Sequence, residues 1–127
     1  MKLIKNIKPE FVDERGGITK ILDDGKTNIK SVLLITSKAG TVRSNHYHKK
    51  DTHYLYVLSG VMEYYEKPVK AKDKPKKVVV KAGDMVYTPT MMIHATKFLK
   101  DTVLVTLSTK SRNQKAYEKD TVRIKLI

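Results

Sequence analysis

The feature that most limits the fold of this chain is a succession of short segments rich in β-branched and aromatic residues, separated by turn residues such as Gly and Asp. Strands are expected at residues 18–22, 29–37, 44–48, 53–59, 61–66, 78–82, 84–88, 94–99, 102–108 and 121–127. Only residues 112–119 suit a helix, and a short one. Because parallel strands need crossover helices and the chain has no room for them, the sequence predicts an all-β sandwich or barrel.

The length of 127 residues suits one domain, which we expect to span residues 1–127. The chain has no cysteine, and its first residues never sustain the apolar run of a secretion signal, which favours a cytoplasmic protein. Apolar stretches such as residues 32–35 have the length of strands, far below the ~20 residues that span a membrane. We therefore expect no membrane association.

The formal net charge of +13 raises the question of nucleic-acid binding. The excess is almost all lysine, whereas recognition of base edges relies heavily on arginine. The positive charge is spread along the chain apart from residues 67–77, where two prolines between strand-like segments indicate an exposed hairpin loop. Nucleic acid is therefore not the expected partner, and the basic surface suits a small polyanion such as a nucleotide sugar.

The four histidines of the chain are spaced in a way that brings them together. His46 and His48 are two residues apart, so on a strand their side chains leave the same face and can form two corners of a metal site. His53 opens the next expected strand after a polar turn, so a hairpin returns it to their side. His94 begins a much later strand, and only the tertiary fold can bring it close.

The spacing resembles the two sequence motifs of the cupin superfamily. Residues 40–60, GTVRSNHYHKKDTHYLYVLSG, meet every spacing of the first motif, G(X)5HXH(X)3,4E(X)6G, with His53 in the glutamate position. Residues 83–98, GDMVYTPTMMIHATKF, keep the first glycine, the proline and the histidine of the second motif, G(X)5PXG(X)2H(X)3N, while Met91 and Phe98 replace its second glycine and its asparagine. The resemblance implies a single-domain cupin, a double-stranded β-helix or small jelly-roll barrel, whose metal ligands are His46, His48, His53 and His94.

The expected cofactor is one divalent transition metal, since neutral imidazoles suit Zn, Fe, Ni and Cu and, less well, Mn. Histidine in the glutamate position removes the anionic ligand, so a bound ion keeps its full charge, attracts anionic ligands and acidifies a bound hydroxyl. The alternative is a metal-free histidine cluster that acts as acid and base.

Three further segments resemble particular sugar-modifying cupins. Residues 43–49, RSNHYHK, resemble the R-G-x-H-x-H-K signature of nucleotide-sugar 3,4-ketoisomerases and the R-G-L-H-Y-Q segment of dTDP-4-dehydrorhamnose 3,5-epimerases, with Ser44 in place of glycine. Residues 13–17, DERGG, resemble the D-E-R-G opening of both families, and residues 117–123 resemble the ketoisomerase tail. His53 stands where the ketoisomerases carry glutamine. The resemblance implies an isomerase or epimerase that moves protons beside the ketone of a sugar.

Such chemistry needs a base and a group that stabilises an enediolate oxygen. We assign catalysis to His46, His48 and Tyr47: a histidine is the base where no metal is bound, and a tyrosine carries the proton where one is. The tyrosines considered are Tyr47, Tyr54, Tyr56, Tyr64 and Tyr87; strand alternation turns Tyr54 and Tyr56 away from His53, toward packing or a dimer interface.

Substrate binding is assigned to Arg43, Lys49 and Tyr87. Arg43 is placed to hold a pyrophosphate, with an ion pair to Asp or Glu as the alternative. Two other functions stay open: a metal-dependent (Fe or Cu) dioxygenase, and a non-catalytic module that binds a sugar or metabolite. We also predict a homodimer in which residues 2–8 and 121–127 cover strand edges through the partner.

Overall fold

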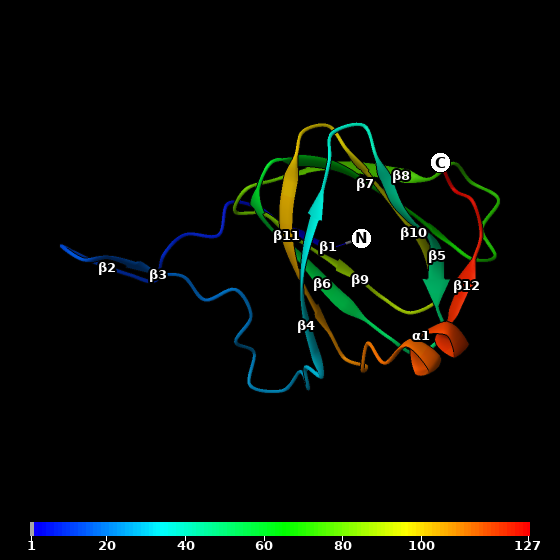
Figure 1. Ribbon diagram of the computed structural model, residues 1–127, viewed down its shortest axis with the longest axis horizontal. Helices are drawn as coiled ribbons and strands as arrows, with labels where there is room; N and C mark the ends of the chain where they lie inside the picture. Colours follow the sequence, from blue (N-terminus) through cyan, green and yellow to red (C-terminus); the bar gives the residue numbers. More distant parts are fainter. Residues whose placement is uncertain (1) are drawn as a thin grey trace.

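Two five-stranded antiparallel sheets dominate the computed structural model, which describes residues 2–127 (Figure 1). The first sheet has the order β1 (Lys2–Ile4), β9 (Met85–Thr88), β6 (His53–Ser59), β11 (Thr102–Ser108) and β4 (Ser31–Ser37). The second has the order β12 (Thr121–Arg123), β5 (Val42–His48), β10 (Met92–Phe98), β7 (Val61–Pro68) and β8 (Lys76–Lys81). The predicted all-β, jelly-roll class is confirmed, with two open sheets rather than one closed barrel across the described strands.

The apolar core lies between the two sheets, toward one end. Its buried cluster takes side chains from both sheets: Leu55, Val57, Met62, Tyr64, Val80, Val86, Phe98 and Leu104. Fully burying a large apolar side chain contributes roughly 1.5–3 kcal/mol, so this cluster holds the sheets face to face. Along β6 the chain passes from His53 to Leu55 and Val57, so polar histidine lies at one end of the strand and the core follows it. The other end of the interior is thereby left for polar side chains.

The segment 18–22 is not a strand, contrary to the prediction. Instead β2 (Phe11–Asp13) and β3 (Gly16–Ile18) form a short hairpin that projects from the two sheets, and no strand lies between Ile18 and Ser31 (Figure 1). The carboxylate of Asp24 accepts hydrogen bonds from the backbone N–H groups of Lys26 at 3.0 Å and Thr27 at 2.8 Å. This local turn lies just after the predicted segment, and residues 19–22 pair with no strand, so a strand-like composition alone does not make them one.

Both chain ends pair within their own chain. β1 runs antiparallel to β9, and β12 runs antiparallel to β5. Within this chain the two ends therefore cover the edges of β9 and β5, and pairing of the ends with a partner stays a prediction.

The predicted short helix is present as α1 (Gln114–Asp120), and the side chain of Asn113 accepts from the N–H of Ala116 at its start. Residues 69–75 link the antiparallel strands β7 and β8, so the predicted basic hairpin loop is confirmed. Among the described residues, no helix is long and apolar enough to cross a membrane.

Candidate functional site

The four histidines meet at the polar end of the interior. His46 and His48 come from β5, His53 from β6 and His94 from β10, and all four are buried. The centroid of the His46 ring lies 4.6 Å from that of His48 and 4.7 Å from that of His94. The centroids of the His53 and His94 rings are 5.1 Å apart. The cluster joins both sheets, as the predicted jelly-roll fold requires.

An irregularity in β5 places His46 opposite His94. The pairing of β10 with β5 shifts between His94 and Ala95, so that Asn45 is an extra residue in β5. Ser44 and Asn45 have φ values of 72° and 56°, and the Asn45 Oδ1 atom accepts from the N–H groups of Leu126 and Ile127. Hydrogen bonds from the C-terminal residues thus stabilise the bulge. Ser44 adopts the left-handed backbone conformation for which glycine is the usual residue.

Met91, a departure from the second cupin motif, also adopts a left-handed backbone. Met91, which replaces the second glycine of the second motif, has a φ of 57°. Its N–H donates to the carbonyl oxygen of His48 at 2.8 Å, which ties the turn before His94 to the end of β5. The turn keeps a left-handed conformation without glycine, at a backbone cost of roughly 1–2 kcal/mol.

Two of the histidines, His48 and His94, have a hydrogen-bond partner at Nδ1, and His53 has a nearby carboxylate there. The Nδ1 atom of His94 lies 3.0 Å from the carbonyl oxygen of Met92, and that of His48 lies 3.3 Å from Thr121 Oγ1 and 3.7 Å from Asp120. The Nδ1 atom of His53 lies 3.9 Å from Asp51. Such outer partners typically fix the ring orientation of metal-binding histidines. The opposite nitrogen of each ring is then available to a ligand in the cluster.

The donor set suits a transition-metal ion. One candidate ligand atom from each of His46, His48 and His94 lies within 4.8 Å of the other two, and His48, Asp51 and His53 form a second, overlapping group. The buried Nε2 atom of His94 has no hydrogen-bond partner among the described residues, which is costly unless a ligand engages it. Asp51 adds a carboxylate that the spacing argument overlooked.

Three of the histidines, His46, His48 and His94, are held neutral, as metal ligands or bases must be. Burial, reinforced by the neighbouring His48 and His53 rings, lowers the pKa of His46 to about 3. Burial also lowers the pKa of His48 and, well below its ordinary value, that of His94. Burial disfavours the imidazolium form, and four rings this close would repel one another if charged.

The metal-free protein should therefore lose stability as the pH falls below neutrality. With a folded pKa of about 3 and an unfolded pKa of ~6.5, His46 binds its proton only in the unfolded chain over this interval. Its contribution to stability is complete above pH ~6.5 and falls on acidification, by about 2 kcal/mol between pH 7 and pH 5. Urea unfolding in chelator at several pH values measures this loss, and His46→Gln should flatten it. An unfolding free energy that stays level from pH 7 to pH 5 would contradict the prediction.

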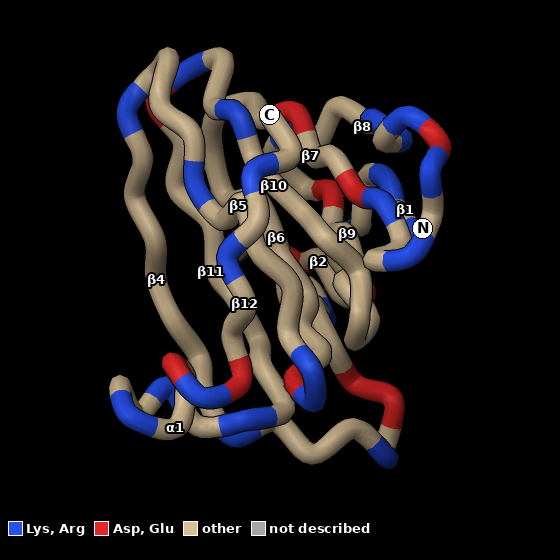
Figure 2. The backbone as a smooth tube through the Cα atoms, turned by 90° about the vertical axis from the view of Figure 1, so that its right-hand side faces the viewer, with Lys and Arg blue, Asp and Glu red and all other residues tan. Residues whose placement is uncertain are grey.

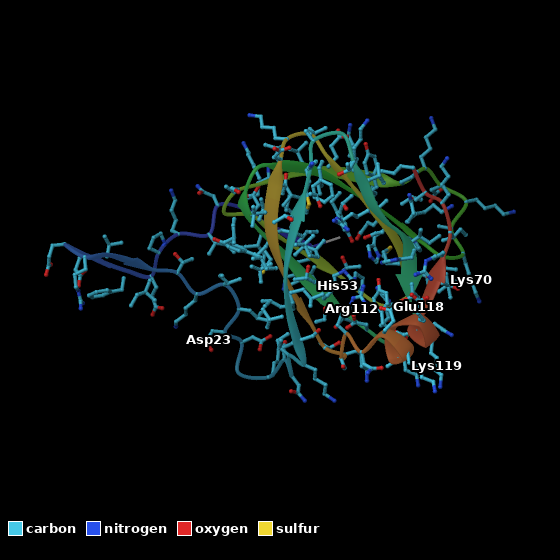
Figure 3. All side chains as sticks on the ribbon, in the orientation of Figure 1. Asp23, His53, Lys70, Arg112, Glu118 and Lys119 are labelled. Atoms are coloured by element: carbon cyan, nitrogen blue, oxygen red, sulfur yellow. The ribbon has the colours of Figure 1, made fainter. Side chains whose placement is uncertain are left out.

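A cavity of about 270 Å³ opens beside the histidines. Arg43, Arg112 and Tyr117 line it together with the four rings. The Tyr117 ring lies 5.4 Å from the ring of His48, and the guanidinium carbon of Arg112 lies 3.5 Å from the centre of the Tyr117 ring. Figure 3 shows Arg112 close to His53 and α1. The cavity therefore combines imidazoles, a phenol, the carboxylate of Asp51 and three cations, Arg43, Lys110 and Arg112.

Arg43 makes no ion pair with Asp or Glu among residues 2–127. Its Nε atom donates to Ser37 Oγ at 2.7 Å and its Nη2 atom to the Thr36 carbonyl oxygen at 3.1 Å. These neutral partners orient the guanidinium and leave its charge available to an anion in the cavity.

The other predicted residues do not line this cavity. Tyr47 lies between His46 and His48 on β5, so its side chain leaves the opposite face of the strand. Tyr87 lies against Tyr54, with ring centres 4.8 Å apart, between the inward-facing Val86 and Thr88. Lys49 lines a neighbouring cavity.

Two segments that resemble those of sugar-modifying cupins, residues 13–17 and 117–123, differ in their distance from the cavity. The D-E-R-G segment spans the turn of the projecting β2–β3 hairpin, away from the histidines of its own chain (Figure 1). Tyr117, Arg112 and Asp51 were missed as site residues. The tail segment at residues 117–123 gave a signal for Tyr117, but no spacing pointed to Arg112 or Asp51.

Tyr64 packs against His94 of the cluster and has a structural role. Its ring stacks 6.4 Å from that of His94, and its hydroxyl group donates to Glu66 at 2.9 Å and lies 2.8 Å from Thr88 Oγ1. Burial raises the pKa of Tyr64. Because the Tyr64 hydroxyl group is buried and hydrogen-bonded, it fixes the position of the ring that packs against His94.

Solved structures with the same fold include several sugar-modifying enzymes. A double mutant of the QdtA 3,4-ketoisomerase from Thermoanaerobacterium thermosaccharolyticum, in complex with TDP, is 26% identical, with a TM-score of 0.76 over 96% of this chain and 86% of that one. A 3,4-ketoisomerase from Helicobacter canadensis is 18% identical, with a TM-score of 0.77 over 96% and 89% of the two chains. The rmlC epimerase of Mycobacterium tuberculosis is 18% identical, with a TM-score of 0.76 over 98% and 73%.

These likenesses confirm the resemblance found in the motifs. No curated protein sequence is significantly similar to the chain. Residues 33–110, more than half of the 127 residues, match the sequence profile of the cupin domain, and all four histidines lie within them. The chain belongs to the cupin family.

Proposed function

We propose that this protein is an isomerase or epimerase that transfers protons on a keto-sugar, most naturally one linked to a nucleotide. The observation that supports it best is the meeting of four histidines, one tyrosine and two arginines in a single cavity. The 26% identity to a 3,4-ketoisomerase solved in complex with TDP, over nearly the whole chain, points the same way.

In the proposed reaction a neutral imidazole removes the proton next to the sugar ketone. His46 and His48 are the candidates, because both line the cavity and burial keeps both unprotonated at neutral pH. The Tyr117 hydroxyl group, on the same cavity, returns a proton to the neighbouring carbon or oxygen. Arg43 and Arg112 hold the anionic part of the ligand, where planar guanidinium groups suit phosphate oxygens.

His46, His48 and His94, with His53 beside them, are the residues that would hold a divalent transition metal. When bound, such an ion supplies polarisation of a ketone or enediolate oxygen. Metal analysis of protein purified without an affinity tag tests this part of the proposal, and metal content near zero after reconstitution would contradict it.

The test of the function is solvent deuterium entering the sugar at the carbon next to its ketone. TDP- and UDP-linked 4-keto-6-deoxy sugars are incubated with the protein in deuterated water, and exchange is read by NMR. We expect exchange with the native protein and none with His46→Ala or His48→Ala, checked for folding by circular dichroism. Exchange that is absent with every metal tried, or that persists in both variants, would overturn the proposal. Oxygen uptake by the same preparation with Fe or Cu would favour a dioxygenase.

We also propose a homodimer formed through the β2–β3 hairpin. Its apolar side chains Phe11, Val12 and Ile18 are 51%, 67% and 63% exposed, and an isolated two-stranded hairpin is marginally stable in water. Val32 and Leu34, on the edge strand β4, are 63% and 68% exposed. A second copy of the chain would cover both surfaces.

Light scattering tests the dimer. We expect twice the mass of the 14.5 kDa chain at micromolar concentration, and a shift toward monomer in Val12→Asp/Ile18→Asp. A native protein that is monomeric throughout the micromolar range would rule the dimer out.

A further inference from the structure

A second and larger cavity, of about 510 Å³, lies beside the histidine cavity and is lined in part by α1. We call it the lysine cavity because five lysines line it: Lys30, Lys49, Lys50, Lys110 and Lys119. They come from four separate parts of the chain: the residue before β4, the β5–β6 turn, the segment after β11, and α1. Figure 2 shows lysines and arginines, with acidic residues among them, along the backbone at the end of the molecule where α1 lies.

The backbone holds these lysines together. The N–H of Lys30 donates to the Ser108 carbonyl oxygen at 2.8 Å, and the Ser31 hydroxyl group donates to the Lys110 carbonyl oxygen at 2.9 Å. The N–H groups of Lys49 and Lys50 donate to the carbonyl oxygen and carboxylate of Asp120, at 3.1 Å and 2.8 Å. The lysine cavity is therefore anchored at each part of its wall.

The charge of the lysine cavity is unbalanced. Asp51 and Asp120 also line it, but both carboxylates accept hydrogen bonds from inside the fold: Asp120 from the β5–β6 turn and Asp51 from Thr109. None of the five ammonium groups forms an ion pair with the part of the chain that the structure describes, whereas Lys20 and Lys77 elsewhere do. Five lysines and two carboxylates line the cavity, so its lining carries a net positive charge that attracts an anion.

We infer that the lysine cavity binds the phosphate groups of a small-molecule anion, at a site separate from the histidine cavity. Flexible ammonium groups on fixed backbone positions suit a multivalent phosphate more than one planar carboxylate. The two cavities share part of their lining, since Asp51, Lys110, Ser111 and Tyr117 line both. The phosphate groups in the lysine cavity would belong either to a ligand that also reaches the histidines or to a separate phosphate compound.

Pyrophosphate is the probe for this site, with binding measured by calorimetry at fixed ionic strength. We expect micromolar to millimolar binding that Lys50→Gln/Lys119→Gln weakens at least tenfold. The matched control is Lys72→Gln/Lys74→Gln in the β7–β8 loop, which removes the same charge from an exposed surface and should leave affinity within about twofold. All four lysines are exposed, so the folds should be unchanged, and thermal melts check this.

Three results would overturn the inference: equal weakening in both double variants, binding that depends instead on Arg43 and Arg112 and is lost in Arg43→Gln/Arg112→Gln, or no binding at millimolar pyrophosphate. A competition titration with TDP separates the two sources of phosphate. Displacement of pyrophosphate identifies one ligand that spans both cavities, and simultaneous binding identifies a separate ligand. The measurement reads binding alone and does not depend on the proposed reaction.

Discussion

Tyr117→Phe should slow deuterium exchange into a keto-sugar by roughly 10²–10⁴-fold, the range that a positioned acid or base contributes. Among the described residues, Tyr117 is the tyrosine that lines the histidine cavity. Phenylalanine keeps the ring that stacks between Arg112 and His48 but removes the hydroxyl group. The substitution therefore takes away a proton carrier and leaves the packing of α1 intact.

The chain offers matched controls for this variant. Tyr47→Phe and Tyr87→Phe remove the same group from side chains that do not line the cavity, and exchange should stay within a few-fold of the native rate. Metal content and melting temperature should match the native protein in all three variants. If Tyr117→Phe exchanged deuterium at the native rate, or if Tyr47→Phe lost as much of that rate as Tyr117→Phe, proton transfer would be assigned to other residues.

The contrast between Tyr47 and Tyr117 shows what local spacing can predict. Strand alternation correctly gave His46 and His48 a common face, and the polar turn before His53 returned the chain beside them. The same alternation rule turns Tyr47 to the opposite face, which argues against the assignment of catalysis to it. Tyr117 reaches the cavity from a helix about 70 residues further along, a placement that only the tertiary fold decides.

The bulge in β5 and the projecting hairpin are features that local patterns do not predict. The bulge depends on the register between β5 and β10 and on a chain tail that bonds to Asn45. Segment 18–22 has a strand-like composition, but within it only Ile18 pairs, with Phe11 in the hairpin, and a turn around Asp24 follows it. Composition reports a tendency toward extended backbone, whereas a strand also needs a neighbour to accept its hydrogen bonds.

Gly60→Ala should destabilise the fold by about 3 kcal/mol, the largest loss we expect from a single added methyl group. Gly60 closes the first cupin motif, in the tight connection between β6 and β7, with a φ of 95°. A side chain in that conformation costs roughly 1–2 kcal/mol. An added Cβ atom would also overlap the Asp101 carbonyl oxygen and Thr102 Oγ1 and lie 2.6 Å from Thr102 Cα. Such overpacking typically costs a further 1–3 kcal/mol.

Gly83→Ala separates the two contributions. Gly83 has nearly the same φ, 91°, but an added Cβ atom there would meet nothing within 4 Å. Its loss should be the conformational part alone, about 1–2 kcal/mol. Urea unfolding measures both variants, and the difference between them reports the collision with Asp101 and Thr102. Because Thr102 is buried at the start of β11, beside β6, the backbone has little room to withdraw. Equal losses in the two variants would show that the β6–β7 connection yields to the methyl group after all.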